Sequence, residues 1–219
     1  MRWCLPFALC AAAFAQTPPA AVDRQSTLPQ GLPPRAAPSD FPSHAQVGAI
    51  TIAADFPGHN IPTREGPVTT EDYVAVEVAF YGPPDAKLVL SAEDFTLRVN
   101  GKKPLAEQSY EDTLRSLRDP NWIPPDSASG DNKKTSVSGS GGGGSKDLTA
   151  PPPPPPPMPP ELRRAMAVRV RRDSMMVGER ALPQAGLLFF SYSGRTDNIK
   201  SIQLIYNGPA GKATIPLEP

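Results

Sequence analysis

The strongest pattern in the chain is the alternation of side chains across residues 73–80 (YVAVEVAF). A repeat of two residues is that of a β-strand, and β-branched and aromatic side chains suit a pleated, half-buried surface. We expect the other strands of the chain to be partners of this one. One face carries Val74, Val76, Val78 and Phe80, and the other carries Tyr73, Ala75, Glu77 and Ala79.

Further short apolar segments predict more strands. Turn residues separate these segments, and Asn100-Gly101 in particular favours the positive φ of a tight hairpin. With residues 73–80 they predict about seven short strands. That pattern is typical of a mostly β protein, and specifically of an antiparallel β-sandwich of immunoglobulin type. The segments are 46–56, 87–90, 95–99, 187–192, 202–206 and 213–217.

Two segments favour short helices. Residues 111–118 (EDTLRSLR) begin with acids and end with an arginine, as the helix dipole prefers. Residues 161–172 (ELRRAMAVRVRR) follow a pair of prolines, which commonly precede a helix. Leu162, Met166 and Val170 lie on one side of this second helix, although Arg169 interrupts the apolar stripe.

Proline divides the chain into domains. The 30 prolines cluster before residue 62 and again between residues 120 and 160, where regular strands are excluded. Residues 16–45 are predicted to be a disordered Pro/Ala-rich leader. Residues 121–160 contain Gly/Ser repeats and a polyproline run, and they predict a disordered insert. The β-sandwich would then occupy residues 46–219, interrupted by this insert.

The first fifteen residues have the features of a secretory signal peptide. Arg2 is followed by an apolar run and by Ala13-Phe14-Ala15, which matches an A-x-A cleavage site. We therefore expect a periplasmic or extracellular protein. Both cysteines, Cys4 and Cys10, lie in this segment, so the mature chain would have no thiol and no disulfide. No later segment is long and apolar enough to predict a transmembrane helix.

Net charge gives no reason to expect nucleic acid as a partner. The whole chain has 22 basic and 22 acidic residues. Removal of Arg2 with the signal peptide leaves 21 basic against 22 acidic residues, a net charge of −1. Nucleic-acid-binding domains are usually strongly basic.

Four segments resemble a known kind of exported domain: EDYVAVEVAFYGPP, SAEDFTLRVNGKK, ERALPQAGLLFFSY and IKSIQLIYNGPAGKATIPL. They resemble a group of uncharacterised exported proteins from soil bacteria. More distantly, they are similar to the immunoglobulin-like domain of unknown function found in bacterial lipoproteins and secreted proteins. The resemblance covers roughly residues 46–118 and 161–219 and implies the fold, with no catalytic residues to transfer. The chain departs from the lipoprotein members by lacking a lipobox and by carrying the Gly/Pro insert.

The inventory of reactive residues predicts no enzyme, no cofactor and no metal site. A Ser-His-acid triad would need one of two histidines: His44 lies in the leader, and His59 lies in a turn-rich loop. With no further His or Cys, Asp55 and His59 do not complete a zinc set. A hydrolase that uses carboxylates on loops is neither supported nor excluded. The candidate pairs are Glu71-Asp72, Glu93-Asp94 and Glu111-Asp112.

Two features predict contacts with a partner. The helix at 161–172 has five arginines and one acid, a local charge of +4, so it could bind an anionic membrane surface or an acidic polymer. The alternative is a helix docked on the sandwich with solvated arginines. We select Arg163, Arg164, Arg171 and Arg172 as candidate interaction residues. Trp122, in the loop 110–124, is a candidate aromatic anchor.

These patterns favour an exported, non-catalytic β-sandwich that serves as a binding or structural module. Its partner would be an unknown protein or a component of the cell envelope. One alternative is an envelope-tethering protein that uses the arginine-rich helix 161–172 and the insert. Another is the loop-carboxylate hydrolase.

Overall fold

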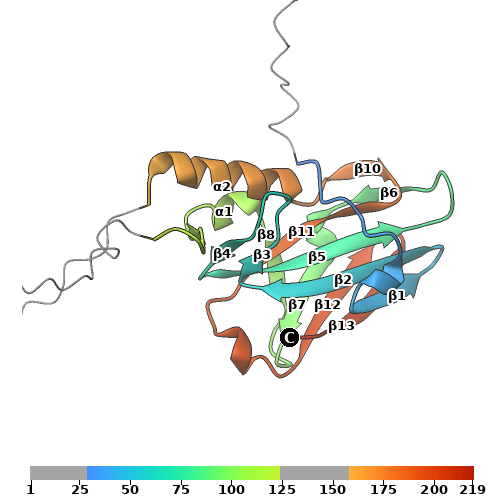
Figure 1. Ribbon diagram of the computed structural model, residues 1–219. Coiled ribbons are helices and arrows are strands. Elements are labelled where there is room, and N and C mark those ends of the chain that lie inside the picture. Colours follow the sequence, from blue (N-terminus) through green and yellow to red (C-terminus); the bar gives the residue numbers. More distant parts are fainter. Residues whose placement is uncertain (1–28, 124–157) are drawn as a thin grey trace, which may run out of the picture.

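The structure is a computed structural model that describes residues 29–123 and 158–219 (Figure 1). The predicted signal peptide, the first part of the predicted leader and residues 124–157 of the predicted insert lie outside the described residues. The described part is mostly β, with two α-helices, α1 (Tyr110–Thr113) and α2 (Pro160–Asp173). The strands before α2 are β1 (Ser43–Val47), β2 (Ile50–Gly58), β3 (Asn60–Ile61), β4 (Val68–Thr70), β5 (Tyr73–Tyr81), β6 (Lys87–Leu90), β7 (Phe95–Val99), β8 (Leu105–Gln108) and β9 (Leu117–Arg118). Those after it are β10 (Gly178–Ala181), β11 (Gln184–Ser191), β12 (Ile202–Gly208) and β13 (Gly211–Leu217).

Eight strands form one large sheet in the order β1-β2-β5-β11-β8-β7-β12-β13. Every neighbouring pair in it is antiparallel. The first and last strands, β1 and β13, lie close to each other, so the sheet curls into a nearly closed barrel (Figure 1). The predicted antiparallel, mostly β fold is confirmed. An immunoglobulin-like sandwich is not confirmed, because β8 pairs with both β7 and β11 and joins the two halves of the sheet.

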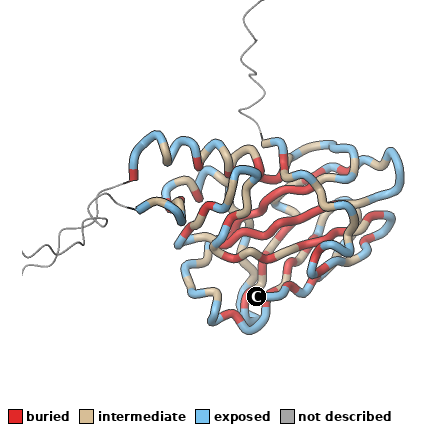
Figure 2. Tube along the Cα trace, in the orientation of Figure 1, coloured by how far each residue is buried: buried red, intermediate tan, exposed pale blue. Residues whose placement is uncertain are grey.

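The predicted central strand is β5, which pairs with β2 on one side and with the whole of β11 on the other. Both of its faces are covered. Its valines and Phe80 belong to the core inside the curled sheet, together with Leu188 and Phe190 of β11. On the outer face, Ala75 packs in a second apolar cluster and Ala79 in a third. Figure 2 shows buried residues along both of these strands.

Helix α2 covers the outer face of β5 and β11 and matches the predicted helix 161–172 within a residue at each end. Met166 and Val170 have no exposed surface and pack with Leu187 and Phe189. Arg169, which interrupts the apolar stripe in the sequence, pairs with Glu65 at the side of the helix.

The predicted helix at 111–118 is only partly correct. α1 is a single turn, capped by the Ser109 hydroxyl, which accepts a hydrogen bond from the Glu111 backbone N–H. The chain then turns, and β9 pairs with β4. Thr113 and Leu117 are both buried, and Leu117 packs in the apolar cluster beneath α2.

The structure also differs from the predicted leader over residues 29–45. Residues 29–41, here called the strap, run across the outer face of the sheet from the end of α2 to β1 (Figure 1). The Leu32 N–H donates to the Ala185 carbonyl at 2.9 Å, and Phe41 is buried against Ala53 and Ala79. Prolines exclude a regular ladder here, but Leu32 and Phe41 still bury apolar surface.

Candidate functional site

Three separate segments share one edge of β11. β5 occupies the other edge along its whole length. On the shared edge, Leu32 of the strap forms a β-bridge with Ala185, and Ser174 at the end of α2 forms one with Leu187. Further along the same edge, β8 pairs with Phe189 and Phe190. A Cβ on Gly186 would lie 2.5 Å from the Met175 Cα, so only glycine permits this crossing. This edge brings the strap, α2 and β8 together.

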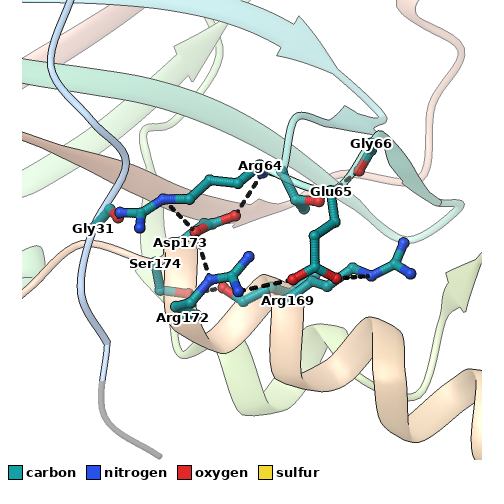
Figure 3. Close-up of polar contacts among 10 residues, drawn as sticks. Gly31, Arg64, Glu65, Gly66, Arg169, Arg172, Asp173 and Ser174 are labelled. Carbon is teal, nitrogen blue, oxygen red and sulfur yellow. Dashed lines mark hydrogen bonds and ion pairs between the residues drawn. The ribbon is translucent and has the colours of Figure 1, made fainter. Parts of the chain in front are cut away.

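A group of five charged residues, here called the ionic clasp, fixes the C-terminal end of α2 (Figure 3). Its centre is Asp173, which has no exposed side-chain surface and pairs with Arg64 and Arg172 at 3.3 Å each. The Arg64 backbone N–H also donates to Asp173 at 2.9 Å. One carboxylate oxygen of Glu65 accepts a hydrogen bond from the Arg172 guanidinium at 2.8 Å. The other oxygen forms an ion pair with Arg169, 2.8 Å from its Nε, but that Nε–H is not aligned for a hydrogen bond.

The strap closes the clasp. Gln30 and Gly31 donate their N–H groups to the Arg172 carbonyl at 2.7 and 3.0 Å, and the Arg64 guanidinium donates to the Gly31 carbonyl. The hydrogen bond from Arg172 lowers the pKa of Glu65, since it favours the charged carboxylate. These contacts are all internal, so we assign the clasp a structural role.

Beside the clasp, a groove of about 850 Å³ lies between α1 and α2 and reaches the start of β5. We call it the α1–α2 groove. Its α2 wall carries Arg164, Arg171 and Val168, with Ala167 between them. Arg164 and Arg171 are seven residues apart, which places them two turns apart on one helix face. The opposite wall comes from α1, the turn after it and the start of β5.

The groove has charges of both signs. The wall opposite α2 carries three exposed acids, and Arg115 adds a further guanidinium from the turn after α1. Within residues 29–123 and 158–219, Arg164, Arg171 and Arg115 make no ion pair. The buried Nε of Arg171 has no hydrogen-bond partner there, and neither do Arg169 Nε and one terminal nitrogen of Arg172 in the clasp. The three acids are Asp72, Glu111 and Asp112.

The candidate interaction residues do not form one surface. Arg164 and Arg171 line the groove, whereas Arg172 belongs to the clasp. Arg163 is exposed on α2 and does not line the groove. Trp122 is half-buried and packs against the cluster beneath α2, and its role as an aromatic anchor stays a prediction. Arg115 was not selected from the sequence, because residues 111–118 were predicted to form a helix.

The other polar candidates have contacts that hold the fold together. The ring nitrogens of His59 lie 2.7 and 2.8 Å from the carbonyl oxygens of Tyr73 and Gly194, and the ring stacks on Tyr192. Asp55 pairs with Arg35 of the strap at 2.6 Å. In the described part of the chain, no group of three or more His, Cys, Asp and Glu side chains is placed to hold a metal ion.

Two of the three carboxylate pairs from the sequence contribute to the groove, through Asp72 and through Glu111 with Asp112. The third pair, Glu93 and Asp94, lines a different hollow beside β12, and Glu93 also lines a hollow between β8 and the end of α2. Burial, with a contribution from the charge of Glu93, raises the pKa of Asp94. Among the described helices, none is long and apolar enough to cross a membrane.

No family model, no curated protein and no solved structure matches the chain. The resemblance to immunoglobulin-like exported domains therefore stays a prediction.

Proposed function

We propose that this protein is an exported, non-catalytic binding module whose contact surface is the α1–α2 groove, and that its partner is a protein. The observation that carries the proposal is the state of Arg171. It lines the groove and forms no ion pair with any described residue, whereas Arg169 and Arg172 of the same helix pair with Glu65. A carboxylate of a partner would give the Arg171 guanidinium the charged acceptor that it lacks among the described residues.

The distribution of charge favours a polypeptide partner over a uniformly anionic one. Arg164 and Arg171 form one wall, while Asp72, Glu111 and Asp112 lie on the other. A partner with only negative charge would be attracted by the first wall and repelled by the second. A polypeptide with acidic and basic side chains close together complements both walls.

Export and the immunoglobulin-like ancestry belong to the same proposal. Export is supported by the pattern of residues 1–15, and the ancestry by the resemblance of the strand segments. The curled antiparallel sheet, with its two apolar layers, is a rigid scaffold of the kind on which binding surfaces are held in place.

Site-directed photocrosslinking tests this proposal. Val168 is 42% exposed at the groove, and Val89 on β6 is 53% exposed away from it, so the two make a matched pair. A photoreactive phenylalanine is placed at each position in turn, and the full chain is irradiated in envelope extract of the source organism. We expect a discrete crosslinked protein at position 168 and none at position 89.

Charge variants provide the second part of the test. Arg164→Gln together with Arg171→Gln should remove the crosslink at position 168, because these residues supply the donors. Identical crosslinks at both positions, or a crosslink that persists in the double variant, would contradict the proposal.

A second candidate function is tethering to an anionic surface through α2. It is favoured by Arg163, Arg164 and Arg171, which form no ion pair with any described residue. However, Arg169 and Arg172 are already paired with Glu65, and the apolar side of α2 is packed against the sheet. The helix therefore has no apolar face left to insert into lipid. Salt-sensitive binding of the full chain to phosphatidylglycerol vesicles, abolished by Arg163→Gln, would favour tethering over the groove.

The loop-carboxylate hydrolase remains the third candidate, since Asp72 and Glu111 line the same groove. Turnover of a glycoside or ester substrate that is lost in Asp72→Asn would favour it. We expect no such turnover.

A further inference from the structure

A second hollow, of about 430 Å³, lies where the shared edge of β11 is divided between β8 and the end of α2. We call it the β8 pocket. Its walls include Met175 and Val177 from the segment after α2, Leu187 and Phe189 from β11, and Pro29 from the strap. The rest of the lining is mostly polar, with three serines, Tyr110 and two carboxylates, and the volume lies in the range of small-ligand pockets.

Two carboxylates line this pocket, those of Glu107 on β8 and of Glu93. Glu107 has no cationic partner among the described residues. The described residues contain no ion pair and no side-chain hydrogen bond to its carboxylate. The charges that act on its pKa are those of two acids, Glu93 from the 3-10 helix Ala92–Asp94 and Asp112 from α1. The segment after α2, β11 and the strap contribute no charged side chain to the lining.

The local chemistry makes the unpaired carboxylate costly. Burial, with smaller contributions from the charges of Glu93 and Asp112, raises the pKa of Glu107 to about 7. Near neutral pH the group is thus poised between its two forms. A cation in the pocket would stabilise the charged form, and the apolar walls would cover an aliphatic chain attached to that cation.

We propose that the β8 pocket binds an organic cation with an aliphatic stem, namely an alkylammonium group of the kind that a lysine side chain carries, with Glu107 as its counter-ion. Charge complementarity supports this ligand class over an anion, and the apolar walls support it over a hydrated metal ion. The site is separate from the α1–α2 groove, although Tyr110 contributes to both linings. The test of this ligand is therefore independent of the test of the proposed function.

Calorimetric titration of the full chain with n-pentylammonium tests the proposal, with n-pentanol as the neutral probe of the same shape. We expect saturable binding of the ammonium and none of the alcohol. Affinity should rise about tenfold between about pH 6 and about pH 8, following the ionised fraction of the Glu107 carboxyl. Glu107→Gln should weaken ammonium binding at least about tenfold at the higher pH.

The matched control is Glu179→Gln, which removes an exposed acid on β10, outside the pocket lining. It should bind n-pentylammonium as the natural chain does. In the natural chain, the NMR resonance of the Glu107 carboxyl should also titrate at lower pH when n-pentylammonium is present. This measurement needs no variant, so it does not depend on whether a variant folds. Arg164→Gln and Arg171→Gln should leave ammonium binding unchanged.

The peptide acetyl-Gly-Lys-Gly-amide distinguishes the two sources of the ligand. Binding of both the peptide and n-pentylammonium would support a lysine side chain of a polypeptide, and binding of n-pentylammonium alone would support a small amine. Binding that is equal in the natural chain and in Glu107→Gln, equal binding of n-pentanol, or no binding of either cation would overturn the proposal.

Discussion

At the scale of single residues, Asp173 and Glu107 are two carboxylates that the fold treats in opposite ways. Asp173 is fully buried but surrounded by two guanidinium groups and a backbone N–H. Glu107 is partly buried with acids as its charged neighbours. The first should stabilise the native state and the second should destabilise it at neutral and higher pH.

Asp173→Ala should therefore lower the free energy of unfolding by about 3 kcal/mol, since Arg172 loses its buried counter-charge and the Arg64 N–H loses its acceptor. Urea unfolding measured by circular dichroism checks this. The control is Asp197→Ala, whose ion pair with Arg195 at 2.8 Å is exposed to solvent. Exposed pairs contribute about 0 to 1 kcal/mol, so the control should unfold almost as the natural chain does. Equal losses in the two variants would contradict the assignment of the clasp as a structural anchor.

Glu107 should produce a pH dependence of stability. Its pKa is about 7 in the folded chain against an ordinary value of 4.5. Between these values the folded state holds a proton that the unfolded state has lost, so stability is highest below the lower value and falls as pH rises through the upper one. We expect a fall of about 1 to 2 kcal/mol after allowance for partial exposure.

Urea unfolding at several pH values checks this slope. Glu107→Gln should remove most of the fall and should be more stable than the natural chain above neutral pH, while Glu179→Gln should keep the slope. A variant Glu107→Gln that shows the same pH profile as the natural chain would show that another group is responsible.

At the scale of elements, the strap is the part whose order depends most on a few side chains. The Arg35 guanidinium bridges Asp55 and the largely buried Glu77 at 2.6 and 2.7 Å, and it also lies over the Phe41 ring. Arg35→Met should leave Glu77 without its counter-charge and release the strap from the sheet. The expected cost is about 2 kcal/mol.

Hydrogen exchange localises that effect. The Leu32 amide, which donates to the Ala185 carbonyl, should lose protection in Arg35→Met, while the amides of β7 and β12 keep theirs. Arg180→Met, an exposed arginine on β10, is the control. Unchanged protection at Leu32 would mean that the backbone contacts alone hold the strap.

The elements that the sequence predicts well are those with a local periodic signal. β5 alternates over its whole length, and α2 has proline at its start and a charge pattern that fits the dipole. β9 and the strap have no such signal, since β9 is two residues paired with β4 and the strap is held by Arg35. Both segments are held in place by residues that are distant in the sequence, and a short window of sequence does not include those residues.

At the scale of the whole molecule, the parts on either side of residues 124–157 are interleaved in one sheet. β11 lies between β5 and β8, and β12 lies beside β7. Neither part can complete the core alone, because Leu188 and Phe190 of β11 pack against Val76 and Phe80 of β5.

We therefore expect that a fragment of residues 29–123 and a fragment of residues 158–219 each lack a cooperative unfolding transition, and that mixing them restores one. Thermal unfolding followed by circular dichroism of each fragment and of the mixture checks this. A cooperative transition in residues 29–123 alone would contradict the single interleaved domain.

The candidate site was only partly predictable for the same reason. Sequence identifies an arginine-rich helix, but it cannot tell which arginines are used inside the molecule. Arg172 and Arg169 pair with Glu65, which lies about a hundred residues earlier, and this leaves Arg164 and Arg171 at the groove. The β8 pocket had no signal in the sequence, because its lining comes from five segments that meet only in the folded chain.

The central claim is that Arg171 at the α1–α2 groove engages a protein partner, and the affinity of the partner captured at position 168 tests it most directly. Calorimetry would compare the natural chain with Arg171→Gln and with Arg163→Gln, an exposed arginine of the same helix outside the groove. We predict that Arg171→Gln weakens binding at least about tenfold and that Arg163→Gln does not. Equal affinity of the natural chain and Arg171→Gln, or an equal loss in Arg163→Gln, would contradict the claim.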